Sequence, residues 1–218
     1  MSLQLKLRQT TPNDYQETEN VIREAFWNVY EPGCSDHYLV HIMRQSDTFI
    51  PELDIVATLN DKIIGNVVYS TAILKADNGE NYPVLALGPI GILPEYHRQQ
   101  VGSKLIDFSR NIAKKMDYRA IFLFGNPKFY RHEGFLPAEK LGIRTSENKY
   151  ADAHHVCELY PGALKNLSGR YFENPIYDVE PEAVKKFDSS FPTKKQIVGT
   201  PSQLEFQKEI TNQHPYQG

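Results

Sequence analysis

The chain has 218 residues, of which 40% are hydrophobic and 11% aromatic, and its formal net charge is −3. This composition is typical of a soluble globular protein and excludes a disordered or membranous chain. No run of Lys and Arg stands out, which argues against a surface for nucleic acid. The two cysteines, Cys34 and Cys157, are too few for a disulfide framework, so we expect reduced thiols and a cytoplasmic protein.

Neither the beginning of the chain nor its apolar stretches predict a membrane segment. Residues 1–10 alternate apolar and polar side chains and are typical of neither a signal peptide nor an anchor. The longest apolar stretch, at 84–93, contains glycine and proline and is too short to span a bilayer. We therefore expect no membrane partner.

The N-terminal half of the chain predicts helices and antiparallel strands. Alternating leucines indicate a half-buried strand at 3–7. Thr11 and Pro12 are typical of the first turn of a helix, and the turn residues at 31–33 end it. The elements expected next are a helix at 36–44, strands at 53–59 and 63–74, and a hairpin turn at 77–79.

A strand–helix–strand unit occupies the centre of the chain. The strand at 82–93 is apolar on both faces, which is typical of the middle of a sheet. A helix at 102–116 separates it from a strand at 119–124, and a crossover of this length makes the two strands parallel. Strands joined by tight turns are antiparallel. We therefore predict an α/β fold with a mixed, mostly antiparallel sheet, a central parallel βαβ unit and flanking helices.

The rest of the chain has weaker patterns. We expect a short helix at 127–132 and strands at 142–145 and 153–160. Residues 1–164 are assigned to one domain, and 165–218 are interpreted as an extension packed on it. The polar last stretch, 205–218, is expected to fray.

The segment 93–105 joins the buried strand to the amphipathic helix. A loop at this point turns free backbone N–H groups toward the end of the strand, and those donors and the helix dipole suit a phosphate or diphosphate. Gly102 allows a close approach of the backbone, and Arg98 can add charge-assisted hydrogen bonds. An ordinary strand-to-helix turn with a solvated arginine is an equal alternative, because neither a Walker loop nor a dinucleotide fingerprint is present.

A second segment, 124–135, begins where the parallel partner strand ends. Both strand ends then lie at one edge of the sheet, where ligand sites form in α/β proteins. Tyr130 lies on the short helix just past that edge. It is either a functional phenol or a packing residue, as many of the 13 tyrosines must be.

Together the two segments resemble the GCN5-related N-acetyltransferase (GNAT) superfamily. The phosphate loop of that family reads Gln/Arg-x-x-Gly-x-Gly/Ala, and the corresponding positions here are His97, Gln100 and Gly102. The family's Phe-Tyr-x-x-x-Gly-Phe signature is matched at 129–135. The likeness covers about residues 3–165. It is strongest to a bacterial branch, the YhbS-like acetyltransferases, at 35–40, 87–96 and 158–164.

The resemblance implies an N-acetyltransferase in which a primary amine attacks the thioester of acetyl-CoA directly, within a ternary complex. A small-molecule acceptor is favoured over a protein, and we expect a monomer or homodimer without a metal. In the family the two parallel strands splay apart around the pantetheine arm. The residues that the resemblance assigns to the cofactor are Ile90, Gly91, Ile92, His97, Arg98, Gln99, Gln100, Val101, Gly102, Ser103, Asn126 and Tyr130.

Tyr130 also occupies the family's position for the general acid. A free tyrosine has a pKa of roughly 10 and a thiol roughly 8.5, so a phenol can protonate the leaving sulfur without a large pKa shift. Many relatives place a glutamate base on the strand before the phosphate loop, but residues 84–93 contain no acid. Glu158 and His132 are candidates for the base, and a water relayed to a carboxylate is an open alternative.

Two positions depart from the family pattern, since His97 replaces Gln or Arg and Gln100 replaces the first glycine. A positive φ at Gln100 costs on the order of 1 kcal/mol. We therefore expect a helical or extended backbone there, in which any L-residue can offer its N–H. The altered loop and the missing strand acid support an alternative function, a non-catalytic acyl-CoA-binding or regulatory module with the same fold.

Other residues favour structural roles. His37 and His41 have the i, i+4 spacing of metal ligands, but no third ligand is evident, so we expect a helix face. Cys157 is interpreted as a small buried hydrophobe rather than a nucleophile. Trp27 and Tyr30 lie in the helical region that covers the acceptor site in relatives, and are either core aromatics or walls of that site.

Overall fold

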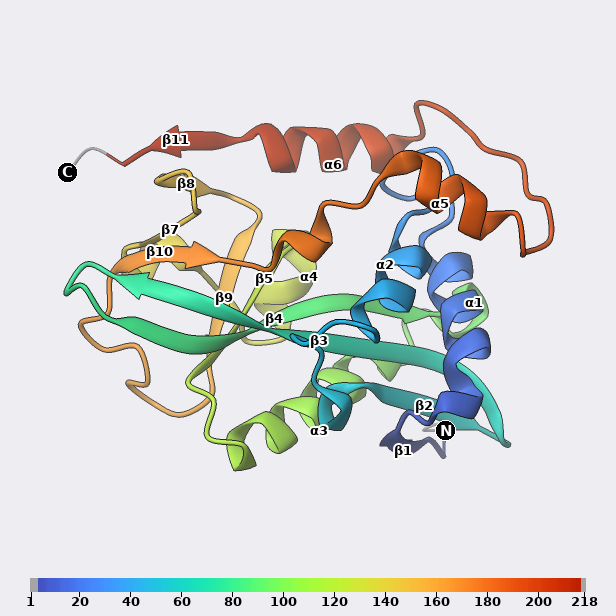
Figure 1. Cartoon of the computed structure of the whole chain (residues 1–218), viewed down its shortest axis with the longest axis horizontal. Helices are drawn as coiled ribbons and strands as arrows, with labels where there is room; N and C mark the ends of the chain where they lie inside the picture. The colour runs from blue at the N-terminus through green and yellow to red at the C-terminus, as the bar shows by residue number, and fades with distance from the viewer. Residues whose placement is uncertain (1–3, 217–218) are drawn as a thin grey trace.

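Strand β4 (Asn81–Ile92) lies in the middle of the sheet, as its two apolar faces predict. The computed structural model describes residues 4–216. The strands follow the order β1-β2-β3-β4-β5-β9-β6, and β10 joins this sheet through β3 and β7 (Figure 1). The bounds of these other strands are β1 Lys6–Gln9, β2 Ile55–Leu59, β3 Lys62–Ala76, β5 Ala120–Phe124, β6 Leu136–Pro137, β7 Ile143–Arg144, β9 His154–Glu158 and β10 Gly169–Phe172.

β4 and β5 form the parallel pair that the sequence predicts. Leu85 faces Ile121 and Ala86 faces Phe122. β3 runs antiparallel to β4, and β9 runs antiparallel to β5. A second, short parallel pairing joins β10 to β7. The mixed, mostly antiparallel sheet with a central βαβ unit is thus confirmed.

Helices cover both faces of the sheet. α1 (Tyr15–Phe26) and α2 (Asp36–Met43) pack on one face, and α3 (Val101–Lys115) packs on the other (Figure 1). A Cβ atom at Gly91 of β4 would lie 2.8 Å from Ile22 Cδ1, so the missing side chain lets α1 approach the strand closely. The remaining α-helices are α4 Pro127–His132, α5 Pro181–Asp188 and α6 Pro201–Thr211.

The main core lies between the sheet and α3. Leu105 and Ile106 of α3 are fully buried in the same apolar cluster as Val67 and Leu85. Burying each such side chain stabilises the fold by roughly 1.5–3 kcal/mol. A smaller cluster packs the two N-terminal helices, α1 and α2, on Val68 of β3.

The two ends of the chain differ from the sequence predictions. The first strand lies at 6–9 rather than 3–7, and Leu3 lies outside the described residues. The expected fraying of 205–218 is wrong for its described part. α6 continues to Thr211, and β11 (Gln213–Pro215) pairs with β8 (Lys149–Ala151). A capping box of Thr200 and Gln203 begins α6, and residues 217–218 lie outside the described part.

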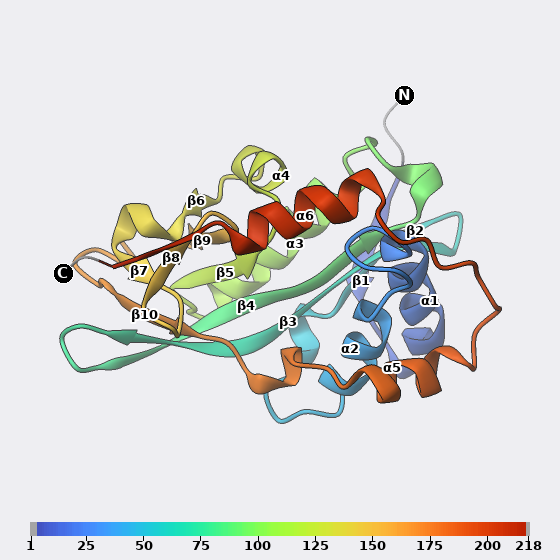
Figure 2. The same cartoon turned by 90° about the horizontal axis from the view of Figure 1, so that it is seen from above.

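We call residues 165–216 the C-terminal segment. Its strand β10 pairs with β3, its helix α5 lies beside α1 and α2, and α6 returns between α4 and β4 in the view from above (Figure 2). Arg23 of α1 holds α5 in place, because its Nε donates to Asp188 Oδ1 at 2.5 Å. The domain division at residue 164 stays a prediction, although β10 belongs to the same sheet as β3.

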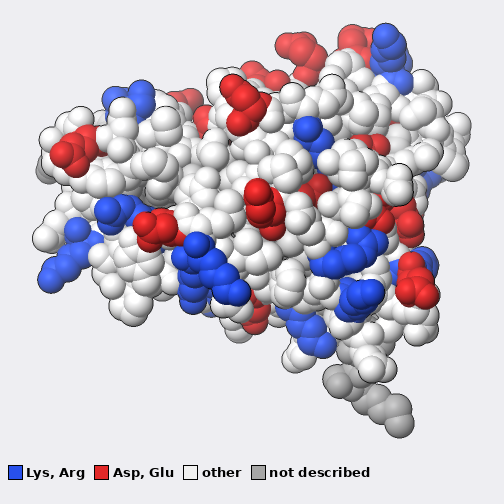
Figure 3. Space-filling view, turned by 60° about the horizontal axis from the view of Figure 1, so that its bottom comes forward, with Lys and Arg blue, Asp and Glu red and all other residues white. Residues whose placement is uncertain are grey.

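Charges of both signs are interspersed on the face shown in Figure 3, and uncharged surface separates them. Within residues 4–216, no helix has both the length and the apolar character needed to cross a membrane.

Candidate functional site

The parallel strands β4 and β5 pair over two residues only and then separate. The pairing ends at Ala86 and Phe122, whereas β4 continues to Ile92. The register of β3 against β4 shifts between Leu87 and Ile90, so an extra residue of β4 bulges at Gly88-Pro89. A bulge bends its strand, and proline lacks the N–H that a regular ladder would use. The bulge therefore directs the end of β4 away from β5.

The separated edge of β4 presents backbone groups to the gap. Leu93 N–H donates to Ile64 of β3 at 2.9 Å, so the carbonyl of the same planar peptide, from Ile92, points the opposite way. By strand alternation the Ile90 backbone faces the gap as well. Gly91 faces α1 with its Cα instead. Of the three predicted strand residues, Ile90 and Ile92 thus lie at the gap and Gly91 allows helix packing.

The loop between β4 and α3 leaves a row of backbone N–H groups without protein partners. A short 3-10 helix, Pro94–Tyr96, follows β4, and α3 begins at Val101. Among the described residues, none accepts a hydrogen bond from the backbone N–H groups of 98–103, which we call the loop amides. Three of them belong to the first turn of α3, where the helix dipole favours an anion. The predicted arrangement of donors is therefore present.

The expected backbone conformation at Gln100 is wrong. Gln100 has φ 62° and ψ 16°, in the left-handed region, and Arg98 has φ 59°. The end of β4 and the start of α3 are both fixed by packing, so the loop must reverse direction within a few residues. Left-handed residues make that reversal at a cost of roughly 1–2 kcal/mol for a side chain with a Cβ. This is the position at which the family pattern has glycine.

Replacing Gln100 with glycine should therefore stabilise the protein by roughly 0.5–1 kcal/mol, because relief of the left-handed strain exceeds the extra chain entropy of glycine. Urea denaturation at equilibrium measures this change. Gln100→Ala is the matched control, since it removes the long side chain but keeps the Cβ atom. If both variants gain the same free energy of unfolding, the stabilisation comes from removal of the glutamine side chain and not from relief of backbone strain.

The side chains of the loop have distinct partners. His97 Nε2 lies 2.9 Å from the Ile92 carbonyl, Gln99 Nε2 donates to Glu95 O at 3.0 Å, and Ser103 Oγ donates to Glu133 at 2.7 Å. These bonds hold the loop and do not point to a ligand. Arg98 is exposed and contacts no described acceptor, so its guanidinium is free to meet an anion.

A cavity of about 460 Å³ lies over the loop amides, and we call it the loop cavity. A Cβ atom at Gly102 would lie 3.3 Å from Ile92 and 3.7 Å from Phe129, so glycine keeps the floor of this cavity open. Gln99 and Asn126 do not line it; Asn126 caps α4 by accepting the Lys128 N–H at 2.8 Å. The lining residues are Ile92, Tyr96, His97, Arg98, Gln100, Val101, Gly102, Ser103 and Phe129.

A second cavity, of about 350 Å³, opens where β4 and β5 separate, and we call it the edge cavity. Ile90 lines it while Ile92 lines the loop cavity, so the two cavities follow one another along β4. Its walls also come from α1, α2, α4 and the C-terminal segment. The lining residues are Phe26, Tyr30, Asp36, Leu39, Leu87, Gly88, Pro89, Ile90, Phe124, Gly125, Tyr130, Glu173, Tyr177 and Phe206.

Tyr130 reaches the edge cavity from α4. Its ring packs edge-on against Phe135, with centroids 5.6 Å apart, and any side chain at Gly125 would collide with it. Burial raises the pKa of the phenol well above its usual range. The expectation that Tyr130 needs no large pKa shift is therefore wrong. A phenol with a raised pKa stays neutral and can donate a hydrogen bond.

Two carboxylates line the edge cavity, and the sequence did not single out either of them. Burial, together with the nearby charge of Glu31, raises the pKa of Asp36 to about 6. Loss of hydration raises the pKa of Glu173 to about 7. Asp36 belongs to the YhbS-like stretch at 35–40, which was a signal for its position, whereas Glu173 lies in the C-terminal segment, where no motif pointed to it.

The two candidate bases lie away from the edge cavity. Glu158 pairs with Ala120 at the start of β5, and its carboxylate accepts the Leu164 N–H at 2.7 Å. Phe124, which lines the edge cavity from β5, lies four residues farther along that strand, roughly 13 Å away. His132 is exposed at the end of α4 and lines neither cavity. The structure therefore does not bring Glu158 or His132 to Tyr130.

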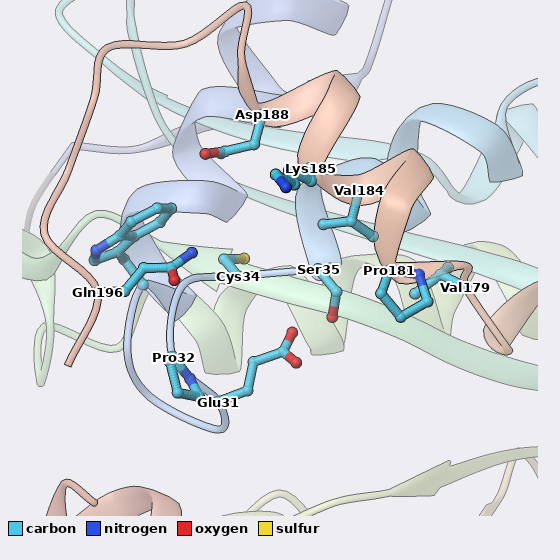
Figure 4. A pocket seen from close by; sticks show the side chains of 11 residues that line it. Glu31, Pro32, Cys34, Ser35, Val179, Pro181, Val184, Lys185, Asp188 and Gln196 are labelled. Atoms are coloured by element: carbon cyan, nitrogen blue, oxygen red, sulfur yellow. The ribbon is translucent and has the colours of Figure 1, made fainter. Parts of the chain in front are cut away.

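A larger cavity, of about 490 Å³, lies between the loop that joins α1 to α2 and helix α5 (Figure 4). Glu31, Cys34 and Ser35 line it from the loop, and Asp188 from α5. None of its described lining residues belongs to β4 or β5. In Figure 4 the side chains of Glu31 and Ser35 face Val184 of α5 across this opening.

The two histidines with metal-like spacing make contacts between helices. His41 Nδ1 lies 3.0 Å from Glu19 of α1, and His37 Nε2 lies 3.1 Å from Asp188 of α5. Burial lowers the pKa of His37 to about 4, although Asp188 opposes that shift. Cys157 is buried at a separate cavity beside Glu158, and burial raises its thiol pKa. These residues join α1, α2 and α5 or fill the core.

Comparisons with known proteins agree with this geometry. The model of a family described as an acetyltransferase (GNAT) domain matches residues 6–138. A curated Escherichia coli (strain K12) protein, the uncharacterized N-acetyltransferase YjhQ, is 26% identical over 100 residues, which are 45% of this chain and 54% of YjhQ. The match thus spans about half the length of that relative.

Two solved structures share the fold. The GNAT family N-acetyltransferase YhbS from Escherichia coli, in complex with CoA, has a TM-score of 0.72 and 22% identity, over 82% of this chain and 94% of YhbS. A GNAT family acetyltransferase from Brucella melitensis, in complex with acetyl-CoA, has a TM-score of 0.63 and 20% identity, over 80% of this chain and 98% of its own. The resemblance inferred from the sequence is confirmed.

Proposed function

The chain belongs to the GNAT family of N-acetyltransferases, and we propose that it transfers the acetyl group of acetyl-CoA to a primary amine of a small molecule. The observation that carries this proposal is the order of groups along the edge of β4. The loop amides lie at one end of that edge, and Tyr130 lies at the other. A donor with a diphosphate at one end and a thioester at the other matches this order.

The residues around the loop cavity fit the diphosphate of coenzyme A. Unpaired backbone N–H groups at a helix N-terminus suit an anion, and Gly102 leaves room for it. Arg98 would add a charge-assisted hydrogen bond. Ile90 would direct its backbone groups to the pantetheine arm, as a neighbouring strand does, whereas the Ile92 carbonyl already contacts His97 Nε2. The CoA and acetyl-CoA complexes of YhbS and of the Brucella melitensis protein support the same donor.

The edge cavity is where the acceptor would meet the acetyl group. The thioester supplies an activated carbonyl carbon for direct attack by the amine. The Tyr130 phenol would donate a hydrogen bond to the departing sulfur, which stabilises its negative charge in a site where little water competes. A volume of about 350 Å³ is at the lower end of ligand pockets and favours a small acceptor.

Two measurements test the proposal. Isothermal titration should detect binding of acetyl-CoA, and release of the CoA thiol should accelerate with at least one member of a primary-amine panel. Binding without turnover on any amine would instead support a non-catalytic acyl-CoA-binding module. A lack of binding would contradict both functions.

Replacing Arg98 with alanine should weaken the binding of coenzyme A by roughly 5- to 10-fold, which is the usual effect of one exposed charge-assisted bond to phosphate. Calorimetric Kd values measure this change. Pantetheine lacks the diphosphate, so its Kd should be the same for both proteins. A weaker affinity for both ligands would show that Arg98 shapes the loop rather than binding the anion.

A further inference from the structure

Asp36 and Glu173 are the acidic side chains of the edge cavity, and neither forms a salt bridge with a described residue. Exposed carboxylates are stabilised by water, and buried ones normally by a cation. Asp36 is half-buried and Glu173 is exposed, yet reduced hydration raises the pKa of each carboxyl, to about 6 for Asp36 and about 7 for Glu173. Two uncompensated carboxylates in one small cavity favour a positively charged ligand.

The two carboxylates lie at different walls of the cavity. Asp36 begins α2 beside Cys34, whose Sγ lies 3.9 Å from Asp36 Oδ2, and its charge acts on the Tyr130 phenol. Glu173 follows β10, and its charge acts on Tyr171 and Tyr177 instead. Asp36 thus lines the cavity from α2, and Glu173 lines it from the C-terminal segment.

Aromatic rings complete the wall that the C-terminal segment provides. The rings of Tyr30 and Phe206 lie 4.4 Å apart, and Tyr177 lines the same cavity. Aromatic faces attract alkylammonium groups and also bury an alkyl chain. This wall can therefore hold both the carbon chain and a cationic end of an acceptor.

The C-terminal segment is fixed in this position by polar contacts on both sides of the cavity. Gln203 Nε2 of α6 donates to Asn28 O at 3.2 Å, and Lys195 O accepts from Trp27 Nε1 at 3.0 Å. Lys128 of α4 lies 2.8 Å from Glu205. The segment is therefore anchored to the end of α1 and to α4, and Glu173 and Phe206 stand at a defined place.

From this arrangement we infer that the acceptor is a small dication, an alkyl chain with an ammonium group at each end, which the two carboxylates bind at separate points. Asp36 binds the reacting ammonium near Tyr130, and Glu173 binds the distal ammonium against the aromatic wall. This inference rests on the proposed acetyltransferase function and names its acceptor class.

Asp36 also takes the proton that the reaction must remove. The reacting ammonium gives one proton to the Asp36 carboxylate and becomes a neutral amine. The nitrogen lone pair forms the N–C bond to the acetyl carbon as the C–S bond breaks. The sulfur leaves with the electron pair as CoA thiolate, and the new amide nitrogen releases its second proton to solvent. The products are an N-acetylated monocation and CoA.

A matched pair of amines tests the inference. n-Butylamine and 1,4-diaminobutane differ by one ammonium group, and both are assayed by thiol release at saturating acetyl-CoA. We expect kcat/KM to be roughly tenfold higher for the diamine, as one charge-assisted contact provides. Glu173→Gln should raise KM for the diamine to that of butylamine without changing kcat. Asp36→Asn should lower kcat roughly 100-fold for both amines.

Glu180→Gln is the control, because Glu180 is an exposed acid of the same segment that lines none of the described cavities. It should leave both amines unaffected, and thermal melts establish that all variants fold. Turnover of monoamines and diamines at equal kcat/KM, or an unchanged preference in Glu173→Gln, would overturn the inference while the acetyltransferase function stands. Failure to bind acetyl-CoA, or to acetylate any amine, would instead remove the proposed function itself.

Discussion

Replacing Tyr130 with phenylalanine should lower kcat for acetyl transfer roughly 100-fold, with the Kd for coenzyme A nearly unchanged. The ring is held by Gly125 and Phe135, and phenylalanine keeps those contacts. What is lost is the hydroxyl hydrogen, which no described residue accepts and which is therefore available for the departing sulfur. A decrease in kcat of roughly 100-fold is at the lower end of what removal of a catalytic proton donor causes. We expect this small effect because the buried phenol holds its proton tightly.

Steady-state kinetics and calorimetry on the same preparations separate the two parts of this prediction. Tyr118→Phe is the matched control, since Tyr118 precedes β5 at the opposite end of that strand from Tyr130. It should change neither kcat nor Kd. If Tyr130→Phe keeps its turnover, the sulfur is stabilised by another donor. If only Kd rises, Tyr130 positions the donor and takes no part in the chemistry.

The features that the sequence predicted well are those set by local patterns. The βαβ unit follows from an apolar strand, an amphipathic helix and a second strand, each long enough for its periodicity to be unambiguous. The short helix at 127–132 begins with an asparagine cap and a proline, and its observed bounds match the prediction. The paired motifs at 97–102 and 129–135 located the loop cavity and Tyr130 because both motifs follow strands that end at one edge.

Other features depend on contacts between distant parts of the chain, and local patterns could not predict them. Gln100 is left-handed because β4 and α3 are fixed on either side of it, and a glutamine gives no sign of that conformation. The polar residues of α6 indicated fraying, yet β11 pairs with β8 and Phe206 packs on Tyr30. Tertiary contacts of this kind outweigh weak intrinsic propensity.

The acid–base groups were the least predictable part of the site. Glu158 was a candidate for the base, but that residue lies at the other end of β9 from the edge cavity. Asp36 and Glu173 meet at one cavity although more than half of the chain lies between them. A carboxylate becomes a candidate base through burial and neighbours, and both are properties of the folded chain.

Replacing Asp54 with alanine should have the largest effect on stability, a loss of roughly 3–5 kcal/mol. The Asp54 side chain is 2% exposed and accepts hydrogen bonds from Arg44 Nε at 2.9 Å, Thr10 Oγ1 at 2.6 Å and Asn66 Nδ2 at 2.8 Å. The Arg44 side chain is equally buried. Alanine leaves that guanidinium without its main counter-charge, which costs more than the ion pair itself contributes.

The charge of Glu19 decides how much stability Asp54→Ala loses. Its carboxylate lies 3.7 Å from Arg44 Nη1, so it can compensate part of the guanidinium charge when Asp54 is absent. Urea denaturation of Asp54→Ala, Glu19→Gln and the double variant measures this coupling. Glu95→Ala, which breaks the exposed pair with Lys62, is the control and should not shift the urea midpoint. If Asp54→Ala lowers the free energy of unfolding by well below about 3 kcal/mol while the double variant loses more, Glu19 replaces Asp54 as the counter-charge of Arg44. A small loss of stability in both variants would mean that water reaches Arg44.

Arg44 directly follows α2, and Asp36 is the first residue of that helix. Loss of the ion pair at Arg44 should therefore also lower kcat, because it displaces Asp36.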